Sequence, residues 1–130
     1  MGWHSVDPSS LEFVERAPRE GEAETRSVAD LIPALELQQS RARLWRYPPH
    51  TTGRRHVEQV QEEVFVVISG ALTMLLGEPP ERVAVGRGGV VAVEPGTPLQ
   101  IRNESEDELL VYIYGSPPDQ TPAEFLGDGF

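Results

Sequence analysis

The side chains best suited to chemistry lie close together near the middle of the 130-residue sequence. His56 and Glu58 are separated by one residue, and Glu63 follows after four more. Side chains two residues apart on a strand point to the same face, so His56 and Glu58 can share one pocket. Imidazole and carboxylate groups exchange protons near neutral pH, and histidine can act as a general base. The spacing therefore predicts a pocket with a polar end that is able to share a proton.

Arginine supplies all 11 basic residues of the chain, because the sequence contains no lysine. Several of them cluster around the segment that carries the histidine and the two glutamates: Arg41, Arg43, Arg46, Arg54, Arg55 and Arg102. A guanidinium group binds carboxylates and phosphates through paired hydrogen bonds. One hypothesis is that some of these arginines converge at the mouth of the pocket and recognise an anionic small molecule. The alternative is that they form exposed ion pairs with the many glutamates, each contributing little.

The composition excludes several classes of function. A net charge of -10 at pH 7 argues against nucleic acid and against an anionic membrane surface, because both partners require clustered basic residues. The lack of cysteine and lysine excludes disulfides, thiolate metal sites and Schiff-base catalysis. The sequence contains no Gly-x-Ser-x-Gly motif, so we do not predict a hydrolase. Without a signal-like N-terminus or an apolar span of about 20 residues, we expect a soluble cytoplasmic protein.

Short β-type segments separated by glycine and proline fill the central part of the chain. They are rich in Val, Ile and Tyr and recur about every ten residues, which is typical of a sandwich or barrel. Several are apolar on both faces, which favours a homodimer or another sheet that covers the outer face. The fold class is therefore all-β, with predicted strands at residues 41–47, 63–68, 71–76, 82–85, 90–93, 99–102 and 109–114.

The two ends of the chain differ from this central region. Residues 1–36 are predicted as an irregular lead-in that packs on a barrel formed by residues 37–116. This lead-in contains at most an edge strand and one helical turn over residues 27–32, which Pro33 ends. Residues 117–130 are predicted as a tail with a short helical turn over residues 121–126.

Two motifs in the central region resemble those of the cupin superfamily. The first is His56-Val57-Glu58 with Glu63 and the hairpin glycine Gly70, and the second runs from Pro95 to Asn103. Over roughly residues 41–115 the chain is similar to small single-domain cupins that often carry the label phosphomannose-isomerase-like. The resemblance implies a double-stranded β-helix, that is, a jelly-roll barrel.

The cupin enzymes that the chain resembles hold Fe, Mn, Ni or Zn with three histidines and one glutamate. By this resemblance, His56 and Glu63 stand where the family has ligands. Glu58 stands in place of the second histidine and Leu99 in place of the third. Gln100 cannot substitute for Leu99, because a shift of one residue turns the side chain to the other face of the sheet. The resemblance therefore implies a metal site that is largely dismantled.

Three interpretations of the pocket remain open from the sequence. The motif residues bind a divalent Mn, Fe or Zn ion completed by waters, or the pocket binds a small organic molecule without a cofactor, or it is a filled core. We adopt the second interpretation and leave open whether any reaction is catalysed. The alternative is a metal-dependent oxidoreductase or isomerase that uses the histidine and the two glutamates. The candidate pocket residues are His56, Glu58, Glu63, Leu99, Trp45 and Arg43.

Overall fold

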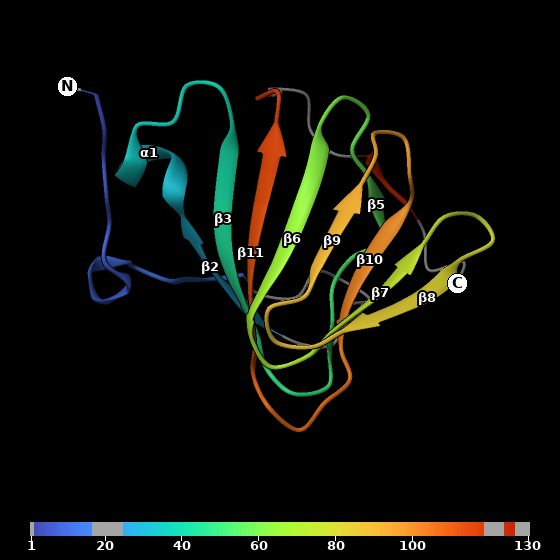
Figure 1. Ribbon diagram of the computed structural model, residues 1–130. Coiled ribbons are helices and arrows are strands. Elements are labelled where there is room, and N and C mark those ends of the chain that lie inside the picture. The colour runs from blue at the N-terminus through green and yellow to red at the C-terminus, as the bar shows by residue number, and fades with distance from the viewer. Residues whose placement is uncertain (1, 17–24, 119–123, 127–130) are drawn as a thin grey trace.

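The computed structural model describes residues 2–16, 25–118 and 124–126 (Figure 1). Within these residues, antiparallel strands form two sheets that enclose one core. The first sheet has the order β1 (Val14–Arg16), β2 (Arg26–Asp30), β3 (Arg41–Tyr47), β11 (Leu109–Ser116), β6 (Glu62–Ser69) and β9 (Val90–Val93). The all-β fold class predicted from the sequence is confirmed.

The second sheet faces the first across the core. Its order is β12 (Glu124–Phe125), β5 (His56–Val57), β10 (Leu99–Asn103), β7 (Leu72–Leu76) and β8 (Glu81–Val85), and β4 (Thr51–Thr52) pairs with the far end of β10. The short strand β4 lies between two of the strands predicted from the sequence, those at residues 41–47 and 63–68. Among the described residues, no helix reaches the length and apolar character that crossing a bilayer requires.

The segment before residue 37 contributes strands to the first sheet and is more regular than the sequence suggested. A turn of 3-10 helix spans Pro8–Ser10, and β2 pairs with β3 along its length. The helical turn predicted at residues 27–32 is wrong in its position, because α1 spans Leu31–Leu35 and includes Pro33. Proline is tolerated there because the first-turn N–H groups of a helix have no partner within the helix. The Asp30 carboxylate caps α1 by accepting a hydrogen bond from the Ile32 N–H.

At the other end of the chain, the predicted helical turn falls partly on residues 121–123, which lie outside the described residues. At Glu124–Phe125 the structure has a strand, β12, in place of a helix. The pairing of β12 with β5 explains this difference, because it supplies hydrogen-bond partners for the backbone of an otherwise exposed sheet edge.

Strict alternation along β6 sorts its side chains between the core and the outer surface. Phe65 and Val67 are each 1% exposed inside the barrel, whereas Val64, Val66 and Ile68 face outward. The residues packed in the core come from both sheets and include Tyr47, Phe65, Val67, Leu72, Met74, Val91, Val93, Leu99, Ile101, Leu109 and Val111.

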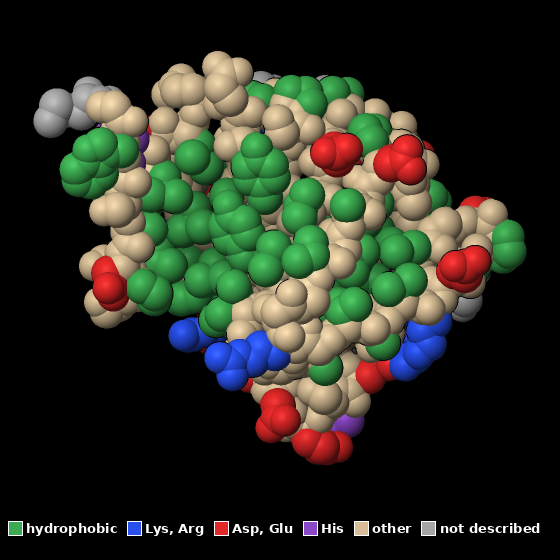
Figure 2. All heavy atoms as spheres, in the orientation of Figure 1, with side chains coloured by type: hydrophobic (Ala, Val, Ile, Leu, Met, Phe, Trp, Pro, Cys, Tyr) green, Lys and Arg blue, Asp and Glu red, His purple; other side chains and the backbone are tan. Residues whose placement is uncertain are grey.

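The outer face of the first sheet is also largely apolar. Figure 2 shows hydrophobic side chains gathered over the area of β3, β11 and β6. Ile68, Val90 and Tyr114 are 46%, 57% and 36% exposed there. Both faces of the strands are therefore apolar, as the sequence indicated.

The hairpin between β6 and β7 depends on a glycine. Gly70 has a φ of +82°, and a Cβ on this residue would lie 2.5 Å from the Glu108 carbonyl oxygen. An L-residue with a side chain is strained at such a φ, and the close contact leaves no room for a methyl group. Glycine is thus required where β6 turns beside the start of β11.

Candidate functional site

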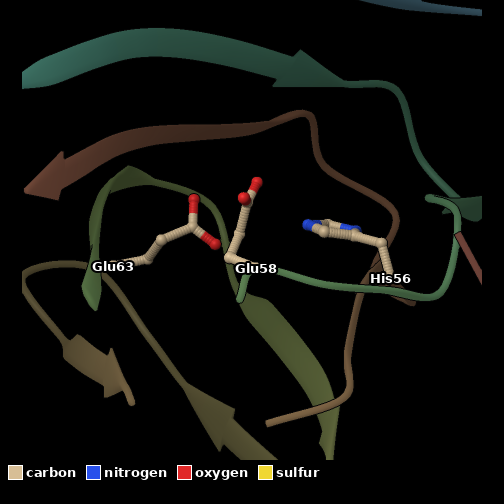
Figure 3. Close-up of side chains that lie close together, drawn as sticks. All are labelled: His56, Glu58 and Glu63. Atoms are coloured by element: carbon tan, nitrogen blue, oxygen red, sulfur yellow. The ribbon is translucent and has the colours of Figure 1, made fainter. Parts of the chain in front are cut away.

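His56, Glu58 and Glu63 meet in one space at the mouth of the barrel (Figure 3). His56 belongs to β5 in the second sheet, Glu63 belongs to β6 in the first sheet, and Glu58 lies in the connection between them. One ligand atom from each residue lies within 4.8 Å of the others. The two sheets thus bring together the residues that the sequence singled out.

The His56 side chain is held in one tautomer by the backbone. Its Nδ1 atom lies 3.1 Å from the Arg54 carbonyl oxygen, which can only accept a hydrogen bond, so Nδ1 carries the proton. Burial lowers the pKa of His56 below its ordinary value of 6.5, and the positive charges of Arg26 and Arg54 act in the same direction. His56 is therefore mainly neutral at pH 7, and in this form Nε2 has the chemistry of a hydrogen-bond acceptor or metal ligand.

The Glu63 carboxyl group is 9% exposed. Burial raises the pKa of Glu63 from 4.5 to about 7, and the neighbouring carboxylate of Glu58 adds to this, against the opposing charges of Arg41 and Arg43. The Glu63 Oε1 atom is buried and has no hydrogen-bond partner within the structure. Near neutral pH this group can therefore both accept and donate a proton.

The residue that faces His56 from the adjacent strand is apolar. Leu99 is 1% exposed, packs in the core and lies directly opposite His56. Gln100 faces away from the site: its Nε2 donates to the Gly53 carbonyl oxygen at 3.0 Å, and its Oε1 accepts from Arg102 Nε at 3.0 Å. Alternation along β10 thus turns Gln100 to the other face of the sheet from Leu99, as predicted.

The candidate residues on β3 also face the interior. Trp45 packs against the core, and its ring centroid lies 6.0 Å from that of Tyr47. Arg43 lies in register with Ile113 and Phe65 on the inner face of the sheet. Burial and then the charge of Arg41 hold the pKa of Arg43 below its ordinary value. Trp45 and Arg43 therefore line the same side of the barrel as Glu63.

The predicted arginine cluster forms only in part. Arg41 and Arg43 act electrostatically on Glu63, and Arg54 acts on His56. The remaining arginines of the group lie away from the site. Arg46 points outward, with its guanidinium 4.1 Å from the ring centroid of Phe13. Arg55 pairs with Glu78, and Arg102 lies beside Glu104. One-residue offsets along the strands turn these side chains away from the site.

Two residues of the site were missed by the sequence reasoning. Arg26 lies on β2, with its guanidinium 5.4 Å from the ring centroid of Trp45 and 5.7 Å from that of Tyr47. Gln61 is 4% exposed, and its Nε2 atom is buried with no hydrogen-bond partner within the structure. Alternation was a usable signal for Gln61, because it stands two residues before Glu63. No comparable signal marked Arg26, which lies in the segment interpreted as an irregular lead-in.

The fold and the site together define a small β-barrel with one histidine and two glutamates gathered at its mouth. Residues 43–114 match the family described as "Cupin domain". The chain belongs to the cupin family. A search of curated proteins found no match to the chain.

Solved structures agree on the fold. A Thermotoga maritima protein described as a predicted oxalate decarboxylase has a TM-score of 0.75 at 16% identity, over 88% of this chain and 99% of its own. A Silicibacter pomeroyi protein described as a sugar phosphate isomerase from a cupin superfamily has a TM-score of 0.74 at 19% identity, over 95% and 92%. An uncharacterized Klebsiella pneumoniae protein with a double-stranded β-helix domain has a TM-score of 0.66 at 20% identity, over 86% and 90%. The predicted cupin-type double-stranded β-helix is confirmed.

Proposed function

We propose that this cupin binds a small organic molecule in the mouth of its barrel, in direct contact with His56, Gln61 and Glu63. The observation that carries the proposal is the pair of buried polar atoms without partners, Gln61 Nε2 and Glu63 Oε1. A buried polar atom that lacks a hydrogen bond costs about 1–3 kcal/mol. Such atoms are rare in folded proteins, and a ligand that supplies the missing bonds accounts for both of them.

The hydrogen-bonding capacities of the three groups are complementary. Gln61 Nε2 donates, His56 Nε2 accepts, and Glu63 does either, depending on its proton. A molecule with both a hydroxyl group and an acceptor oxygen matches this set. The apolar side chains of Leu99, Trp45 and Ile113 line the same interior and suit a carbon skeleton.

A thermal-shift screen of small polar metabolites, made with EDTA present, tests the proposal. We expect at least one compound to raise the melting temperature of the wild type. Gln61→Leu should remove that response while leaving the ligand-free protein as stable or more stable, because the variant deletes an unsatisfied donor. Gln59→Leu is the matched control, since Gln59 is exposed and bonds to Glu124 at the surface.

Two outcomes would contradict the proposal. In the first, no compound of the screen stabilises the wild type. In the second, Gln61→Leu lowers the stability of the ligand-free protein by several kcal/mol and leaves every ligand response intact, as expected for a residue that only fills a core.

A divalent cation on His56, Glu58 and Glu63 is the second candidate, because their ligand atoms lie within 4.8 Å of one another. One neutral imidazole and two carboxylates fit Mn, Fe or Zn. Such an ion would supply Lewis-acid chemistry for an oxidoreductase or isomerase. Two features argue against this candidate. The nearby arginines carry the same sign of charge as the cation, and Leu99 has no atom that can bind a metal ion. Moreover, the amide nitrogen of Gln61 can donate a hydrogen bond but cannot bind a cation.

Metal analysis separates the two candidates. Protein purified without added metal or a His-tag should contain substoichiometric Mn, Fe and Zn if the pocket binds an organic molecule directly. A stoichiometric metal content that His56→Ala abolishes would favour the second candidate and overturn the first.

A further inference from the structure

We propose that the ligand of this site is an organic anion whose carboxylate or phosphate group is bound by Arg41, Arg43 and the Gln61 amide. The inference rests on the proposed function, because it assigns a chemical class to the same ligand. Guanidinium groups bind both kinds of oxyanion through paired, charge-assisted hydrogen bonds.

The first support is a continuous row of register partners on the inner face of the first sheet. Arg41 pairs with Gly115, Gly115 pairs with Glu63, and Glu63 pairs with Val93. Val93 is 5% exposed, which shows that this row faces the interior. Arg41 and Glu63 therefore stand on either side of a residue without a side chain, on the surface that lines the barrel.

Gln61 occupies the space above that glycine. Its Oε1 atom lies 2.8 Å from the position that a Cβ on Gly115 would take, so the amide packs across the strand between Arg41 and Glu63. The Nε2 donor of this amide, buried without a hydrogen-bond partner in the structure, is thus located between a guanidinium and a carboxyl group. An anionic oxygen at this place would accept hydrogen bonds from the amide and from the guanidinium together.

Arg43 adds a second guanidinium one row further along the same face. It pairs in register with Ile113, which in turn pairs with the buried Phe65. Arg43 also lies opposite Asp30 of β2, whose negative charge acts on it, and the Asp30 carboxylate caps α1 as well. Arg41 and Arg43 are two residues apart on β3 and so project on the same side.

The charge of the site is opposite in sign to that of the whole protein. The chain has a net charge of -10, yet Arg26, Arg41, Arg43 and Arg54 all act on the titratable groups at the barrel mouth. The carboxylates that act there among the described residues are Asp30, Glu58 and Glu63. Among the described groups that act at the mouth, the arginines therefore outnumber the carboxylates, and burial strengthens the attraction of a guanidinium for an anion.

The position of the neutral histidine indicates what the rest of the ligand carries. His56 Nε2 has the chemistry of a hydrogen-bond acceptor, and His56 lies on the opposite sheet from the arginines. A hydroxyl group on the ligand could donate to this atom while the anionic group binds to β3. The chemical class is therefore a small hydroxylated acid, with either a carboxylate or a phosphate as its anionic end.

Titration calorimetry with matched probes tests the inference. The carboxylate probes are lactate and malate, the phosphate probes are glucose 6-phosphate and inorganic phosphate, and the neutral probes are lactamide and glucose. All titrations contain EDTA and the same concentration of sodium chloride. We expect at least one anionic probe to bind about tenfold or more tightly than its neutral counterpart, and the probe that binds best identifies carboxylate or phosphate as the source.

Substitutions on one strand provide the control. Arg41→Gln and Arg43→Gln should each weaken binding of the anion about tenfold or more. Arg46→Gln should leave binding unchanged, because Arg46 lies on the outer face of the same strand. Circular dichroism and melting temperature verify that each variant is folded.

The outcomes separate this inference from the proposed function. If lactamide or glucose binds as tightly as the corresponding anion in the wild type, or if Arg46→Gln weakens anion binding as much as Arg41→Gln, the anionic class is wrong while small-molecule binding stands. If neither charged nor neutral probes bind and the wider screen also yields no ligand, both are overturned. The comparison of wild-type affinities needs no variant, so it decides the question even if a substitution prevents folding.

Discussion

Burying the Glu63 carboxyl group makes the stability of this protein depend on pH in a specific window. Burial raises the pKa of Glu63 from 4.5 to about 7, so the folded state binds the proton more tightly than the unfolded chain. The stabilisation from the protonated group is complete below pH 4.5 and is lost as the pH rises through 7. One pKa unit corresponds to about 1.4 kcal/mol, so the loss amounts to about 3 kcal/mol above pH 7.

Glu63→Gln replaces the acid by a neutral group of the same shape and should remove this dependence. We expect wild type and variant to have similar unfolding free energies at pH 4 and the variant to be more stable by about 3 kcal/mol at pH 8. The measurement is urea unfolding followed by tryptophan fluorescence across this range, with EDTA present. Glu62→Gln on the same strand is the control, because Glu62 is exposed and faces outward.

The test is the difference in unfolding free energy between wild type and variant at each pH, because groups that do not interact with Glu63 titrate equally in both proteins. A Glu63→Gln difference that stays flat between pH 4 and pH 8, or that equals the Glu62→Gln difference, would refute the reasoning about burial. A fall in the relative stability of the variant with increasing pH would show that the ionised carboxylate is stabilised in the fold, which is the opposite sign.

Three further predictions concern the fold and its surroundings. Leu99→His places a second imidazole opposite His56. The variant should bind Zn²⁺ about tenfold or more tightly than the wild type, as measured by calorimetry. It should also lower the unfolding free energy by about 2 kcal/mol, because a polar ring replaces a buried leucine. Gly70→Ala should lower the unfolding free energy by about 2 kcal/mol or more, whereas Gly86→Ala, where a Cβ would meet no atom within 4 Å, should change it by less than about 0.5 kcal/mol. We also propose that a second copy of the chain covers the apolar outer face of the first sheet. Light scattering should then give twice the chain mass for the wild type and the monomer mass for Val90→Glu. A monomeric wild type would contradict the proposal.

Most of the barrel could be predicted from the sequence because its strands are marked locally. Val-rich and Ile-rich segments between glycines and prolines correspond to β6, β7, β8, β9 and β11 within a few residues. The strand β2 could not be recognised in this way, because its sequence Arg26–Asp30 is short and half polar. Its conformation comes from pairing with β3, and no property of the segment alone reports that partner.

The site shows the same division between local and long-range information. The motif identified His56, Glu58 and Glu63, and alternation correctly excluded Gln100. Which arginines reach the mouth depends on strand pairing and facing direction. Arg46 is adjacent in sequence to Trp45 but lies on the other face of the sheet. Proximity in the sequence therefore does not by itself select the arginines that act on His56 and Glu63.

The pairing of β12 with β5 has a practical consequence for work on this protein. Glu124 and Phe125 lie opposite Val57 and His56, and the Leu126 N–H donates to the Arg55 carbonyl oxygen at 2.9 Å. The last described residues thus form the outer border of the strand that carries the histidine. Deleting Glu124 and the residues after it would leave β5 as an unpaired edge strand. The position of the His56 side chain would then be less well fixed. Variants made for measuring ligand affinity should therefore retain Glu124, Phe125 and Leu126.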